Sequence, residues 1–196
     1  MGVLKYIIRW LLHLRSIFLR HCTVWLAASL LMSPPVPGHA ETSIGEYSLK
    51  TAFIYNFAKF VEWPDSAFRK KDEFCIASLG RSPIDRELAA LSGKTVQGRS
   101  IVITQINTPE EANNCQVVFI SRSELVRFDS ILESLRNVPV LTIADRDDFC
   151  MNGGMLSLVN EGGKIVFDVN IREAQRSRLK PNPQLLRLAR KIYGRQ

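Results

Sequence analysis

Four short apolar segments, each followed closely by residues that start helices, constrain the fold of this chain more than any other feature. The apolar segments are residues 74–79, 101–106, 117–120 and 138–143. The helix-start signals that follow them are Ser82 with Pro83, Thr108 with Pro109, Ser121, and Asp145. Strands that alternate with helices are joined by right-handed crossovers, so we expect a mainly parallel sheet with helices on both faces.

The last part of the chain departs from this alternation. Two apolar segments, residues 155–159 and 164–169, flank the turn sequence Asn-Glu-Gly-Gly at residues 160–163, which predicts an antiparallel hairpin. Helical patterns then cover residues 171–179 and 185–193. The predicted fold class is a three-layer α/β sandwich, in which a mainly parallel sheet ends in a C-terminal antiparallel hairpin and helices cover both faces.

A helix with an aromatic face is predicted before the first of these strands. Ser43 and Glu46 form a capping box, which predicts the start of the helix, and Trp63 with Pro64 predicts its end. Its apolar side chains recur at helical spacing, whereas Lys50 falls outside the apolar stripe. The stripe contains Leu49, Phe53, Phe57 and Phe60. A stripe of this kind is more often part of a core than a cofactor site.

The first forty residues have the order of a secretory signal peptide. A basic lead precedes the apolar run at residues 24–32, and prolines and the sequence Gly38-His39-Ala40 follow it. We therefore expect residues 1–40 to be a signal peptide cleaved after Ala40, and residues 41–196 to be an exported, periplasmic domain. The alternative is a retained membrane anchor, but the apolar run is shorter than the ~20 residues that a membrane span needs.

Histidine is absent from residues 41–196, because His13, His21 and His39 all precede them. A Ser-His-Asp or Cys-His catalytic arrangement therefore cannot form. The three remaining cysteines lack the close spacing of a zinc site. The carboxylates of Asp145, Asp147 and Asp148 are expected to favour a helix N-terminus rather than to catalyse hydrolysis. We expect no catalytic site, no metal site and no cofactor.

Two cysteines of the exported domain are placed to form a disulfide. Cys75 begins the first predicted strand and Cys115 immediately precedes the third. These strands are neighbours in a common order of parallel sheets, and an oxidising compartment preserves disulfides. We expect a structural disulfide between them; the alternative is two buried free thiols. Cys150 is then left unpaired.

Two surfaces are candidates for binding. Arg81, Ser82 and Arg122 follow strands at what would be the carboxyl edge of the sheet, where they would form a small anion pocket, although ordinary loops contain the same residues. The segment from residue 172 onward holds eight basic residues and one acidic residue. Such a cluster often binds nucleic acid, which an exported protein does not meet, so we expect either a solvated helix face or a docking surface.

Several sequence segments together resemble the YfiR family of periplasmic proteins. The most specific is Ala-Phe-Ile-Tyr-Asn-Phe-Ala-Lys-Phe-Val-Glu-Trp-Pro at residues 52–64. The others are Ile-Ala-Ser-Leu-Gly at 76–80, Val-Leu-Thr-Ile-Ala-Asp at 140–145, Gly153 with Gly154, Ile-Val-Phe-Asp-Val-Asn at 165–170 and Leu-Leu-Arg-Leu-Ala at 185–189. The resemblance covers nearly all of residues 45–192, in order.

The resemblance implies an α/β sandwich without enzymatic activity, commonly a homodimer. Members of the family hold an inner-membrane diguanylate cyclase inactive by binding its periplasmic domain. Redox changes in the envelope, or sequestration by an outer-membrane lipoprotein, release the cyclase. Cys75 and Cys115 match the structural disulfide of the family. Cys150 matches half of a second pair, but Ser157 stands at the expected partner position, which argues against a second redox-active bridge.

We therefore expect a periplasmic sensor and inhibitor that represses an inner-membrane diguanylate cyclase by contact, and so tunes cyclic-di-GMP signalling and biofilm formation. The expected partner surface is the last strand and the terminal helices, because they combine polar groups with an apolar stripe. Its residues are Asp168, Asn170, Leu185 and Leu188. The alternative is a periplasmic small-ligand binding module that uses Arg81, Ser82 and Arg122.

Overall fold

The computed structural model describes residues 40–195, with side chains from residue 45 onward. The predicted signal peptide therefore lies outside the described residues, except for Ala40. One compact unit comprises Thr42–Gln196. The first half of its described elements is α2 (Ala40–Phe60), β1 (Val61–Glu62), η1 (Asp65–Ala67), β2 (Glu73–Leu79), α3 (Ile84–Ala89), β3 (Thr95–Val96), β4 (Arg99–Ile106), η2 (Pro109–Asn114) and β5 (Val117–Ile120). The second half is η3 (Arg122–Arg127), α4 (Phe128–Ser134), β6 (Leu141–Ala144), β7 (Leu156–Glu161), β8 (Lys164–Asn170), α5 (Ile171–Arg176), β9 (Lys180–Pro181), α6 (Pro183–Leu188) and β10 (Lys191–Tyr193).

The main sheet has eight strands in the order β10-β8-β7-β6-β5-β2-β4-β3. Its centre is parallel: β4, β2, β5 and β6 are neighbours that all run in one direction, as the alternating pattern predicts. β7 continues this direction, and β8 returns antiparallel to it, which confirms the predicted hairpin. β3 adds an antiparallel edge on one side, and β10 adds a parallel edge on the other.

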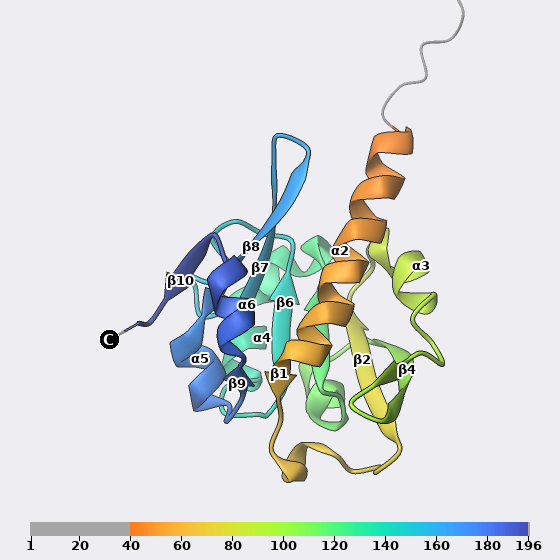
Figure 1. The fold of residues 1–196 in the computed structure, drawn as a ribbon, viewed down its shortest axis with the longest axis vertical. Helices are drawn as coiled ribbons and strands as arrows, with labels where there is room; N and C mark the ends of the chain where they lie inside the picture. Colours follow the sequence, from red (N-terminus) through yellow and green to blue (C-terminus); the bar gives the residue numbers. More distant parts are fainter. Residues whose placement is uncertain (1–39, 196) are drawn as a thin grey trace, which may run out of the picture. The chain divides into compact units, whose positions relative to one another are not determined.

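Two hydrophobic clusters, one on each face of the sheet, confirm the three-layer architecture. Side chains of β5 alternate between them: Val117 and Phe119 belong to one cluster, and Val118 and Ile120 to the other. The first cluster also contains residues of α2, α3, α5 and α6, and the second contains residues of α4 and η2. Figure 1 shows α2 crossing the sheet on the same face as α5 and α6.

The aromatic face of α2 packs on the hairpin as the stripe predicts, except that Leu49, the first residue of the stripe, is 43% exposed. The ring of Phe57 lies edge-on to that of Phe167 in β8, with 5.0 Å between centroids, and Phe53 lies 5.8 Å from the same ring. Trp63 beyond the helix meets Phe74 of β2 edge-on at 5.2 Å. These pairs hold the C-terminal part of the helix against the sheet.

The helix begins at Ala40, three residues before the predicted capping box at Ser43. Alanine and glutamate favour helices, and no proline or glycine separates Ala40 from Ser43, so nothing stops the helix at the predicted position. The predicted start of this helix was therefore wrong.

Two further predictions of helices were wrong. The chain after Asp145 forms turns rather than a helix. In the C-terminal segment, helix α6 ends at Leu188, and Ala189 adopts an extended conformation with ψ of 137°. Residues Lys191–Tyr193 then pair in parallel with β8, whose main chain hydrogen-bonds to theirs. The C-terminal segment is thus a short helix and an edge strand rather than one helix over residues 185–193.

Candidate functional site

The expected partner surface near the C-terminus is organised around Arg190. Its guanidinium donates from Nε and Nη2 to the two carboxylate oxygens of Asp168, at 2.8 and 2.7 Å. It also contacts Asp147 at 2.8 Å and Glu161. These hydrogen bonds, first of all those to Asp168, raise the pKa of Arg190. Asp168 is completely buried, so the paired guanidinium compensates for the loss of water around its charge.

The other residues of this expected surface divide into buried and exposed ones. Asn170 is buried: its Oδ1 accepts from the backbone of Glu173 and caps α5, and its Nδ2 donates to the carbonyl of Cys150 at 2.8 Å. Leu185 is buried in the first cluster. Leu188 is 74% exposed. The structure therefore gives Asp168, Asn170 and Leu185 an internal supporting position, and leaves Leu188 as the residue of the four that a partner can touch.

Cys150 lies beneath the same surface as a buried free thiol. Its Sγ is 3.4 Å from the carbonyl oxygen of Asp168 and 3.5 Å from that of Met155. Burial, with the charge of Asp168 as a second cause, raises the pKa of this thiol to about 12. The group is therefore a neutral, weakly donating thiol at physiological pH.

A disulfide joins Cys75 to Cys115, the two expected residues, with 4.4 Å between their Cα atoms. Gln116, which follows Cys115, accepts a hydrogen bond from the backbone of Cys75 at 2.7 Å and donates to the carbonyl of Ala67 at 2.6 Å. The indole of Trp63 donates to the carbonyl of Gln116 at 3.0 Å. The disulfide, the end of α2 and η1 are thus connected through Gln116, a role that no sequence motif indicated.

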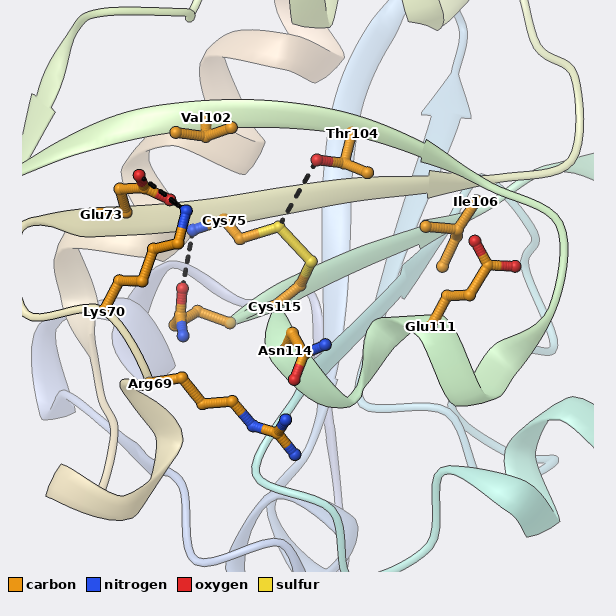
Figure 2. Close-up of a pocket in the computed structure, with 11 residues that line it drawn as sticks. Arg69, Lys70, Glu73, Cys75, Val102, Thr104, Ile106, Glu111, Asn114 and Cys115 are labelled. Carbon is orange, nitrogen blue, oxygen red and sulfur yellow. Dashed lines mark hydrogen bonds and ion pairs between the residues drawn. A yellow bond between two sulfur atoms is a disulfide. The ribbon is translucent and has the colours of Figure 1, made fainter.

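A pocket of about 530 Å³ lies beside this disulfide, as Figure 2 shows. It is bordered by the loop before β2, by one face of β4 and by η2. Lys70 pairs with Glu73 at its rim, at 3.0 Å. Glu111 accepts hydrogen bonds from the backbones of Asn107 and Thr108 and forms a capping box with Thr108 at the start of η2. These hydrogen bonds lower the pKa of Glu111. Arg69 makes no ion pair among the described residues.

The residues of the predicted anion pocket already form hydrogen bonds with other groups of the protein. Arg122 donates to the carbonyl of Asp145 at 2.9 Å and to its carboxylate at 3.3 Å. The main chain of Arg81 bonds to the hydroxyls of Ser121 and Ser123, and its side chain is exposed. The hydroxyl of Ser82 accepts from the backbone of Ile84. The pocket beside the disulfide includes none of Arg81, Ser82 and Arg122.

The carboxylates considered for catalysis are all paired with basic residues. Asp148 pairs with Arg146, which lowers its pKa. Asp147 pairs with Arg190, as described. Asp145 pairs with the ammonium of Lys50 at 3.1 Å. Within the described residues, no group of three or more histidine, cysteine or acidic side chains is placed to hold a metal ion.

The burial of Lys50 is not predicted by the helical pattern. Lys50 falls outside the predicted apolar stripe, yet only 2% of it is exposed. Its ammonium lies 2.5 Å from Glu46 on the same helix and 3.1 Å from Asp145 after β6. Because a buried ammonium needs nearby carboxylates, the ion pairs explain its position.

The family model for YfiR/HmsC-like proteins matches residues 47–190. The chain belongs to the YfiR/HmsC-like family. The YfiR-like family is periplasmic and is known for regulation of diguanylate cyclases, and it is not a catalytic family. Among the described residues of this YfiR/HmsC-like chain, no helix is both long and apolar enough to cross a membrane.

Two solved structures resemble the fold of this YfiR/HmsC-like chain. One is the ABC domain in complex with L-Trp from Streptococcus pneumonia, at 9% identity and a TM-score of 0.50 over 75% of this chain. The other is a conserved domain protein from Vibrio cholerae, at 9% identity and a TM-score of 0.50 over 74% of this chain. The matched region spans 60% of each of these structures. At such low identity, the likeness concerns the fold alone.

Proposed function

We propose that this protein is a periplasmic sensor and inhibitor that represses an inner-membrane diguanylate cyclase by binding its periplasmic domain. The observation that carries the proposal is the family match over residues 47–190. Repression of the cyclase lowers cyclic-di-GMP and thereby limits biofilm formation. An outer-membrane lipoprotein that captures the repressor would release the cyclase. In this proposal residues 1–40 are a signal peptide, and residues 41–196 are the exported domain.

The proposed contact surface is centred on helix α6. Leu188 presents an apolar side chain that is 74% exposed. Beneath it, Leu185 is fixed in the core, and Arg190 holds the following segment to Asp168. A large exposed apolar side chain on a rigid support is the kind of anchor that contributes strongly to protein binding.

The experiment is co-purification with the solubilised cyclase from the same cell, together with measurement of cellular cyclic-di-GMP. We expect the wild-type protein to retain the cyclase and to lower cyclic-di-GMP. Leu188→Arg is expected to weaken retention about tenfold or more, because a charge replaces the apolar anchor. Val126→Arg is the matched control, since Val126 is an apolar residue on η3 that is 99% exposed. Failure of the wild-type protein to retain the cyclase would overturn the proposal.

A second candidate function, a small-ligand binding module, is supported by the pocket of about 530 Å³ beside the disulfide. Its volume is in the range of small-molecule sites. The L-Trp complex of the Streptococcus protein adds an example of ligand binding by a related fold. The pocket that the sequence predicts at Arg81, Ser82 and Arg122 is less suitable, because Arg122 already donates a hydrogen bond to Asp145. Titration calorimetry with amino acids and nucleotides tests this candidate, and Arg69→Ala should abolish any heat that arises in the pocket.

A further inference from the structure

The outer edge of β4 is only partly covered. β3 pairs with Arg99 and Ser100 at the start of β4. Two further hydrogen bonds join the main chain of Ile101 to Gly93 and Lys94, at 3.0 and 2.8 Å. Within residues 40–195, no backbone hydrogen bond reaches this edge beyond Ile101. Residues 102–106 therefore form an open edge of the eight-stranded sheet.

The direction of the main-chain groups along this edge follows from two hydrogen bonds. The N–H of Ser100 donates to Asp72, on the side of β2, and the N–H of Ile101 donates to Lys94, on the outer side. Because the main-chain groups of a strand alternate in direction, those of Ile103 and Gln105 also point outward. The open edge thus offers two N–H and two C=O groups to another strand.

This edge lacks the usual protection against strand pairing. Exposed edges in soluble proteins are commonly protected by charged side chains, prolines, bulges or very short strands. Residues 101–106 contain no charged residue, proline or glycine. Five of the six are β-branched isoleucine, valine or threonine, and Gln105 is the exception. Ile103 and Thr104 are partly exposed, and Gln105 is exposed. The edge is therefore chemically suited to accept a further strand.

We propose that this edge pairs antiparallel with the same edge of a second copy of this chain. In the proposed register Thr104 lies opposite the partner's Thr104, and Ile103 lies opposite the partner's Gln105. The main-chain N–H and C=O groups of Ile103 and Gln105 both point outward, so each Ile103–Gln105 pair forms two hydrogen bonds. The two-fold axis generates two such pairs, so the register forms four main-chain hydrogen bonds. A register centred on Ile103 would form only two, because it places Gln105 opposite Ile101, whose main-chain groups are already bonded to Gly93 and Lys94.

The charges at the two ends of β4 favour a second copy as the occupant. Its amino end lies beside Lys94 and Arg99, which make no ion pair among the described residues. Its carboxyl end leads directly into Glu110 and Glu111 of η2. Antiparallel pairing places the basic end of each copy near the acidic end of the other. A parallel arrangement would bring like charges together.

The pocket beside the disulfide adjoins the proposed contact. Val102, Thr104 and Ile106 line the pocket from one face of β4, as Figure 2 shows. The two Thr104 side chains would face each other on this same side of the joined sheet. Directly opposed threonines in a non-hydrogen-bonded pair interact favourably across antiparallel strands.

Sedimentation velocity of the purified protein over a range of concentrations tests the proposal. Gln105→Pro removes the outward N–H donor, and proline is tolerated at a solvent-facing edge position. Gln105→Thr is the matched control, because both variants lose the side-chain hydrogen bond from Gln105 to Gly80 but only proline loses the donor. We expect dimers for the wild type and Gln105→Thr, and a dissociation constant about tenfold or more higher for Gln105→Pro.

A charge pair provides an independent test if Gln105→Pro fails to fold. Thr104→Lys and Thr104→Glu each place like charges opposite each other in a homodimer, so each alone should be monomeric. An equal mixture of the two should form a heterodimer that weakens with added salt. A wild-type monomer at every concentration, or unchanged dimerisation of Thr104→Lys, would overturn the proposed pairing.

Discussion

Lys50 of α2 donates a hydrogen bond to Asp145 at the end of β6 over 3.1 Å, in a place where both side chains are buried. The pair connects the middle of the long helix to the centre of the sheet. Glu46 shares the same ammonium and accepts a hydrogen bond from Asn160 in the β7–β8 hairpin at 2.7 Å. One buried cation therefore links the helix, the sheet and the hairpin.

Removing this cation should destabilise the protein. Lys50→Met keeps most of the side-chain volume but leaves Asp145 with Arg122 as its remaining basic partner. We expect a loss of about 3 kcal/mol in the free energy of unfolding, measured by urea denaturation. Lys59→Met is the control, since Lys59 is an exposed lysine on the same helix. Equal losses for the two variants would contradict the role assigned to the buried pair.

The disulfide should contribute strongly to stability. Cys75 and Cys115 are 40 residues apart in the sequence, and a closed loop of that length restricts the unfolded chain by about 4 kcal/mol. The double variant Cys75→Ala and Cys115→Ala should lose about this amount, measured by the denaturant midpoint. Reducing agent should destabilise the wild-type protein in the same way and leave the double variant unchanged. A response of the double variant to reducing agent would show that another group is being reduced.

Cys150 should make stability depend on alkaline pH. Its folded pKa is about 12, whereas the pKa of an unfolded cysteine is about 8.5. The contribution of the protonated Cys150 thiol to the free energy of unfolding is fully present below pH 8.5. It is lost progressively as the pH rises toward 12, because in this range only the unfolded state releases the proton. Between pH 8 and pH 10 the wild type should lose about 2 kcal/mol more than Cys150→Ala, which has no thiol to titrate. A constant stability difference between the two proteins over this range would refute the assignment.

Ser157→Cys should create a second disulfide. Ser157 is aligned with Asp168 on the neighbouring strand, and the Sγ of Cys150 lies 3.4 Å from the carbonyl oxygen of Asp168. The family resemblance implies a cysteine pair at these two positions in some members. With glutathione disulfide as the oxidant, two thiols are oxidised as one glutathione disulfide is reduced to two glutathione molecules. The variant should then show no free thiol under denaturing conditions, whereas the wild type shows one in its exported domain. A persistent free thiol in the oxidised variant would mean that the two side chains cannot reach bonding geometry.

Arg190 should hold the final strand in place. Arg190→Lys keeps a positive charge but cannot form the paired hydrogen bonds to both oxygens of Asp168. We expect faster amide hydrogen exchange at Lys191–Tyr193, which pair with β8, and little change at β5 in the sheet centre. Arg187→Lys, on α6, is the control. Unchanged exchange at the final strand would show that strand pairing alone is sufficient.

The central sheet could be predicted because its signals are local. Residues 117–120 are a short apolar run between polar residues, and the structure has the same strand, β5. The helix-start residues at Thr108 and Ser121 also act as expected, although the helices that follow are short 3₁₀ turns. In such places the neighbouring residues determine the conformation.

The predictions failed where distant residues determine the conformation. Lys50 is buried because Asp145, 95 residues later, provides its counter-charge. The final segment becomes strand β10 because β8 has an unpaired edge and Asp168 binds Arg190. The burial of Asp168, Asn170 and Leu185 also depends on these long-range contacts, so only Leu188 of the expected partner surface is exposed. Periodicity contains no information about such partners.

The pairing of β1 with β9 has a consequence for the biogenesis of the protein. Val61 is aligned with Pro181, and the rings of Phe53 and Phe57 pack on Phe167. The ribosome makes the long helix first, but the segments that cover it are made near the end. Until then Phe53 and Phe57 lack the contact with Phe167, and exposed apolar surfaces attract chaperones, proteases and other unfolded chains. Nascent chains that stop before residue 167 should therefore depend on chaperones, however complete their first strands are.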